Sequence, residues 1–130
     1  MPENNNLQRY FWTEEDIKAL PVLPEPVEAF DIATDEKVVL KVERWGLYQH
    51  LIHPTWPGAP AEKLVIALRL WMQPGYEGPR APYWDLHQGH LISMIYPFLQ
   101  KEDYKDYEII ITKRGTPPKA YFEVEFKKPE

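Results

Sequence analysis

The sequence predicts one mainly β domain from its length, its proline content and its pattern of apolar residues. The chain has 130 residues, which is enough to close one ordinary hydrophobic core. Its 14 prolines cut helices short and favour strands joined by rigid loops. Several segments alternate apolar and polar residues with a period of two, which is typical of half-buried strands. A composition that is 44% hydrophobic and 27% charged is globular rather than disordered.

The composition also excludes some classes of protein and site. The chain has no cysteine, so it has neither disulfides nor thiolate metal ligands. No apolar run is long enough to cross a bilayer, and the start "MPENNNLQRY" lacks the basic and apolar regions of a signal peptide. We therefore expect a soluble, cytoplasmic protein that does not bind membranes.

Residues 1–36 form an acidic, proline-rich leader. It holds nine acidic residues against Arg9 and Lys18, a net charge of −7, whereas residues 37–130 carry +2. Thr13 and Asp16 have the spacing of a capping box, which predicts a short helix that ends before Pro21. Residues 21–30 hold three prolines and should run extended over the surface.

Two segments in the first half of the remaining chain read as strands. In residues 37–45 the alternation places Lys41 and Trp45 on the polar, outward face, and residues 46–53 continue extended. In residues 63–73 it places Arg69 and Trp71 outward. The leucine and alanine content there also permits a helix, but alternation flanked by proline-glycine loops favours a strand.

The second half adds a short strand at 83–86, a helix, and a hairpin of strands at 106–115 and 119–127 joined by "GTPP". Residues 37–130 thus show the element order of an OB-fold. We expect a small five-stranded OB-like barrel with one helix between strands three and four.

All four histidines lie in two HxxH pairs, His50 with His53 and His87 with His90. On a helix, His87 and His90 would share a face and could hold one metal ion. The competing interpretation is a helix start, with Asp85 as N-cap and Gln88 completing a capping box. An apolar stripe follows this start, and Pro97 should end or kink the helix near Tyr96. We favour the helix start and predict no metal, while the histidine site stays an open alternative.

The chain carries no GxSxG, P-loop or HEXXH sequence, so we expect no catalytic residues, no enzyme activity and no cofactor. Tryptophan interleaved with lysine or arginine on a sheet instead suits single-stranded nucleic acid, because bases stack on the rings and cations follow the phosphates. The predicted nucleic-acid-binding residues lie on the two outward strand faces, a loop and the hairpin: Lys41, Trp45, Arg69, Trp71, Arg80, Lys113, Arg114 and Tyr121.

A non-enzymatic protein-interaction module is the alternative function. Tryptophan, tyrosine and arginine are also enriched at protein interfaces. The aromatic face or the acidic leader would then bind a protein partner or a second copy of the chain.

Residues 83–126, "YWDLHQGHLISMIYPFLQ…YEIIITKRGTPPKAYFEVEF", resemble small OB-fold single-stranded-DNA-binding proteins of phages and mobile elements. The resemblance rests on a helix followed by a strand that ends in Thr112, Lys113, Arg114 and Gly115, a turn, and a strand with Tyr121 or Phe122 and Val124. It implies single-stranded DNA as the partner.

Overall fold

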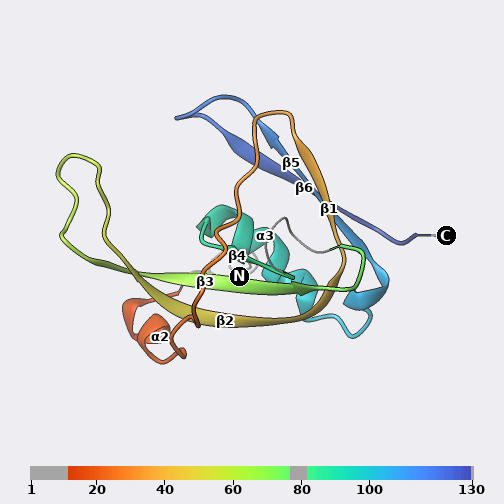
Figure 1. Cartoon of the computed structure of the whole chain (residues 1–130), viewed down its shortest axis with the longest axis horizontal. Coiled ribbons are helices and arrows are strands. Elements are labelled where there is room, and N and C mark those ends of the chain that lie inside the picture. The colour runs from red at the N-terminus through yellow and green to blue at the C-terminus, as the bar shows by residue number, and fades with distance from the viewer. Residues whose placement is uncertain (1–11, 77–81, 130) are drawn as a thin grey trace, which may run out of the picture.

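The computed structural model describes residues 12–76 and 82–129, and its strands form two separate antiparallel sheets (Figure 1). The first sheet has the order β2–β3–β4, with bounds Val42–Ile52, Lys63–Met72 and Tyr83–Leu86. The second has the order β1–β5–β6, with bounds Lys37–Leu40, Glu108–Arg114 and Tyr121–Lys127. The helices are α2 (Glu14–Lys18), α3 (Gly89–Leu99) and the short 3₁₀ helix η1 (Tyr104–Asp106). The mainly β class is confirmed, whereas the five-stranded closed barrel is wrong: these residues form six strands in two open sheets.

The extra strand arises at Lys41, where the chain passes from one sheet to the other. The flanking residues Leu40 and Val42 are both almost fully buried, 2% and 1% exposed, although they lie in different sheets. The carbonyl of Lys41 accepts a hydrogen bond from the N–H of Gln73 at 2.8 Å. The segment 37–45, predicted as one strand, therefore supplies β1 and the beginning of β2.

Helix α3 packs between the sheets and contacts both β3 and β6. It buries Leu91, Ile92, Ile95, Phe98 and Leu99, which confirms the apolar stripe. The predicted capping box is wrong, because Asp85 belongs to β4 and the N-cap, Gln88, makes no side-chain capping bond. The helix also continues through Pro97 to Leu99 instead of ending near Tyr96.

Residues 21–30, which we call the strap, cross the first sheet from one edge to the other (Figure 1). Val22 bridges Gln49 of β2, and Ala29 bridges Asp85 of β4. Between these bridges the strap passes the central strand β3. There, Arg69 of β3 donates hydrogen bonds to two carbonyls of the strap. The strap thus makes one parallel bridge to each edge strand of this sheet.

The strap is extended as predicted, but it is not only a surface segment. Leu23 and Phe30 are each 2% exposed. Phe30 and Ile32 also belong to the hydrophobic core that joins both sheets and α3. Residues 12–36 and 37–129 thus share one core.

Two local predictions hold. Thr13 and Asp16 form the capping box of α2, with reciprocal bonds of 3.0 and 3.1 Å. Strands β5 and β6 form a hairpin in which every second residue of β6 is exposed. Within residues 12–76 and 82–129, no helix has the length and apolar character that a membrane span needs.

Candidate nucleic-acid interface

The two tryptophans predicted to share one outer face lie on opposite faces of the first sheet. The β2–β3 register shifts between Val42 and Arg44, so Trp45 lies opposite Leu70, whose side chain is fully buried. The Trp45 ring packs edge-on against Tyr96 of α3, with the centroids 5.5 Å apart. Trp71 instead lies opposite Arg44 on the other face. The prediction that Trp45 faces outward is wrong, because the bulge moves it to the core side.

Arg69 occupies the outer face of β3 but is only 3% exposed. Its Nε lies 2.6 Å from Oδ1 of Asp85, and its Nη2 lies 3.0 Å from Oδ2. Nη2 also donates to the carbonyls of Pro24 and Pro26 in the strap, at 2.7 and 3.2 Å. The prediction of an outward, phosphate-contacting Arg69 is therefore wrong: the strap covers it, and its Nε and Nη2 donors are occupied.

Asp85 is fully buried and fixes the strap from the other side. Beyond its two bonds from Arg69, its Oδ2 accepts the backbone N–H of Glu28 at 2.8 Å. Tyr83, 8% exposed, donates its hydroxyl to the carbonyl of Pro26. Arg69 and Asp85 thus form a structural anchor, which we call the strap anchor.

Trp71 stacks against an arginine, Arg44, that the sequence did not indicate as a binding residue. The guanidinium carbon of Arg44 lies 3.7 Å from the centroid of the Trp71 ring. Arg44 is exposed and Trp71 is half-buried. Below them, the ring of Tyr83 lies 6.4 Å from that of Trp71 and supports it from β4. We call Arg44 and Trp71 the Arg–Trp stack.

Two cations near the Arg–Trp stack have no acidic partner in the described parts of the chain. Glu43 lies between Lys41 and Arg44 in the sequence. Its carboxylate is 3.6 Å from the ammonium of Lys105. Among the described residues, no carboxylate lies within ion-pair distance of Lys41 or Arg44. Lys41 lies at the same end of the first sheet as Trp71, since its carbonyl binds the N–H of Gln73. This end of the sheet therefore combines an aromatic ring with two positive charges that no described carboxylate pairs.

The predicted hairpin cations lie on opposite faces of the second sheet, and both are already paired. Arg114 and Tyr121 lie opposite each other on β5 and β6. The guanidinium of Arg114 binds Glu123 at 3.0 Å and Asp35 at 3.3 Å. Lys113 has a 17% exposed side chain, and its ammonium lies 3.3 Å from Asp31. A phosphate would have to displace these carboxylates.

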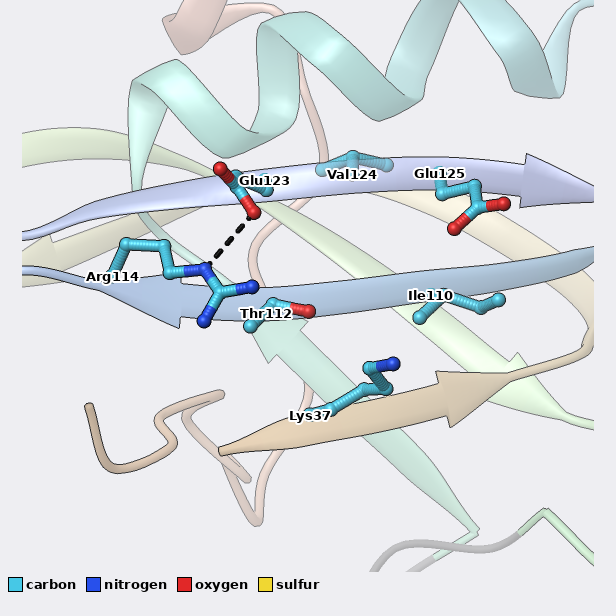
Figure 2. A pocket seen from close by; sticks show the side chains of 7 residues that line it. All are labelled: Lys37, Ile110, Thr112, Arg114, Glu123, Val124 and Glu125. Atoms are coloured by element: carbon cyan, nitrogen blue, oxygen red, sulfur yellow. Dashed lines mark hydrogen bonds and ion pairs between the residues drawn. The ribbon is translucent and has the colours of Figure 1, made fainter. Parts of the chain in front are cut away.

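A shallow hollow of about 170 Å³ lies on the face of the second sheet that carries Arg114. Figure 2 shows Lys37 of β1 beside Ile110, Thr112 and Arg114 of β5, with Glu123 and Glu125 of β6 across from them. The two carboxylates balance the charges of Lys37 and Arg114, so this hollow offers a phosphate no net positive charge. Of the remaining predicted residues, Tyr121 is 50% exposed at the edge of this surface, and Arg80 lies outside the described residues.

An exposed tryptophan in a loop was also missed. Trp56, in the loop between β2 and β3, is 52% exposed, and the ammonium of Lys63 lies 5.6 Å from its ring centroid. The signal in the sequence is a tryptophan inside a proline-glycine loop with a lysine nearby. Arg44 gave no such signal, because its face depends on the β2 bulge.

The histidine pairs separate in the fold. His53 and His90 are exposed, whereas His50 and His87 are half-buried and contact each other. Within the described parts of the chain, no three histidine or acidic side chains are grouped as metal ligands. His87 precedes α3 rather than lying on it, so the helical pair that the sequence suggested does not form.

We compared the chain with known protein families, proteins and structures. No protein-family model, curated protein or solved structure matches the chain.

Proposed function

We propose that this chain binds single-stranded nucleic acid, with single-stranded DNA as the expected ligand, at the Arg–Trp stack. The observation that carries the proposal is the 3.7 Å contact between the Arg44 guanidinium and the Trp71 ring. Single-strand binders combine such flat aromatic and guanidinium surfaces with cations that follow the backbone. The resemblance of residues 83–126 to phage-type single-stranded-DNA-binding proteins favours the same ligand.

In this proposal a base stacks on the Arg–Trp stack and Lys41 meets the adjacent phosphate. Base–aromatic stacking contributes about 1–3 kcal/mol per base. One stack therefore supports weak binding of a short stretch, with little preference for sequence. The net charge of +2 on residues 37–130 is far below that of a duplex binder, so double-stranded DNA should bind poorly.

Fluorescence anisotropy of a labelled oligo-dT tests the proposed residues. Trp71→Ala should weaken binding about tenfold, which corresponds to the lower half of the stacking range. Arg44→Ala should weaken it and also reduce its dependence on salt. Near-UV circular dichroism checks that each variant is folded.

Trp56→Ala is the matched control, because it removes a more exposed tryptophan that also has a cationic neighbour. It should bind as the unchanged protein does. If Trp56→Ala loses binding and Trp71→Ala does not, the ligand binds at the other end of the β2–β3 hairpin and the assignment to the Arg–Trp stack is wrong.

A protein-interaction module is the second candidate, and the second sheet favours it. Tyr121 and Val39 are 50% and 39% exposed, and the neighbouring Arg114 is paired with Glu123 and Asp35. In the part of the chain that the structure describes, β6 has a strand neighbour on only one edge. A strand of a partner protein could form hydrogen bonds with the other edge of β6 and so extend the sheet. Sedimentation velocity over a range of concentrations tests self-association, and Tyr121→Asp should abolish it; a monomer at every concentration speaks against a second copy as the partner.

A further inference from the structure

Each HxxH pair contributes one histidine to a contact between distant parts of the chain. Nδ1 of His50 lies 2.9 Å from Nε2 of His87, and the ring centroids are 5.0 Å apart. His50 lies in β2, opposite Val65 of β3. His87 directly follows Leu86, the last residue of β4, which is paired with β3. Both rings are therefore held by the same three-stranded sheet, which limits how far they can move apart.

The backbone of Asp85 also holds the His87 ring. The ring is half-buried, and it makes a hydrogen bond with the backbone of Asp85. A backbone bond to the second ring nitrogen commonly orients a metal-binding histidine.

The spacing of the two nitrogens matches that of neighbouring metal ligands. Imidazole nitrogens bind at about 2.0–2.1 Å from an ion. Two such bonds at a right angle place their nitrogens about 2.9 Å apart, as in tetragonal Ni²⁺ or Cu²⁺ sites. To bind an ion, the two rings must turn so that both lone pairs point at one position. The hydrogen in the bond between the two rings then moves to the other nitrogen of the imidazole that carries it.

We infer that His50 and His87 form a two-histidine site for one divalent transition-metal ion of the class that prefers imidazole, with Ni²⁺ and Cu²⁺ as the best geometric match. Within residues 12–76 and 82–129 no third histidine or carboxylate joins them, so water occupies the other coordination positions. The site lies apart from the Arg–Trp stack and does not depend on nucleic-acid binding.

Isothermal titration with Ni²⁺ tests this inference on the full chain. The unchanged protein should bind one ion, and either His50→Ala or His87→Ala should bind about a hundredfold more weakly, because the second ligand no longer acts within the same molecule. The double variant His53→Ala/His90→Ala is the matched control, because it removes two histidines but leaves the two that converge. It should bind as the unchanged protein does.

Paramagnetic broadening gives a second measurement that does not depend on affinity. Ni²⁺ should broaden the imidazole NMR signals of His50 and His87 before those of His53 and His90. Circular dichroism confirms folding of each variant. Three results overturn the inference: no saturable binding, full binding by the His50→Ala/His87→Ala protein, or loss of binding in the His53→Ala/His90→Ala protein.

Discussion

Replacing Arg69 by alanine should destabilise the protein strongly, because it removes one half of the strap anchor. The Asp85 carboxylate is 0% exposed and takes two of its three hydrogen bonds from Arg69. Without the guanidinium, a buried negative charge keeps only the N–H of Glu28. Breaking a buried ion pair in this way costs about 3–5 kcal/mol. The carbonyl of Pro24 loses its donor as well, whereas that of Pro26 keeps the Tyr83 hydroxyl, so we expect the upper part of this range.

Urea unfolding measures the loss, which is large against the usual total stability of about 5–15 kcal/mol. The double variant Arg69→Met/Asp85→Leu buries no charge and should be more stable than either single variant, with a coupling of about 2 kcal/mol. Arg114→Ala is the matched control, because its ion pairs with Glu123 and Asp35 are solvent-exposed and should matter little. If Arg69→Ala costs no more than Arg114→Ala, the anchor does not hold the strap.

Two further predictions concern pH and backbone geometry. Because the pKa of His87 is lowered in the folded state, the unfolded chain takes up a proton first as the pH falls, so stability declines below the ordinary histidine pKa of about 6.5. In urea titrations between pH 7.5 and 5.5, His87→Gln should reduce this decline in the free energy of unfolding, and His53→Gln should not. Equal declines in the unchanged protein and both variants contradict the role of His87. Gly115 has φ +77° and a Cβ there would lie 3.0 Å from the carbonyl of Lys119, so Gly115→Ala should cost about 1–2 kcal/mol. Gly89→Ala meets no neighbour within 4 Å and should cost nothing; similar losses for both glycines refute this explanation.

Local patterns predicted the local structure of this chain well. The capping box of α2 follows from the spacing of Thr13 and Asp16, and the β5–β6 hairpin follows from alternation around a turn. These features depend on residues that are close in the sequence. The predictions that failed depend on residues that are far apart.

The failed predictions share one cause, which is that the partner could not be read from the segment itself. Arg69 looked like a surface cation because nothing near it in sequence shows that residues 24–26 cover it. Asp85 looked like a helix cap because its true partner lies 16 residues earlier. Trp45 looked exposed because one extra residue in β2 reverses the faces of the strand. The candidate site therefore moved from a row of strand residues to the Arg–Trp stack.

A titration of fluorescein-labelled oligo-dT with the full chain, at about 20 mM and 200 mM salt, tests the proposed function most directly. We predict saturable binding at low salt that weakens at high salt, little binding of a duplex with the same label, and a clear loss for Trp71→Ala. Absence of binding at low salt, or equal binding by the Trp71→Ala protein, contradicts the proposal that the Arg–Trp stack binds single-stranded nucleic acid.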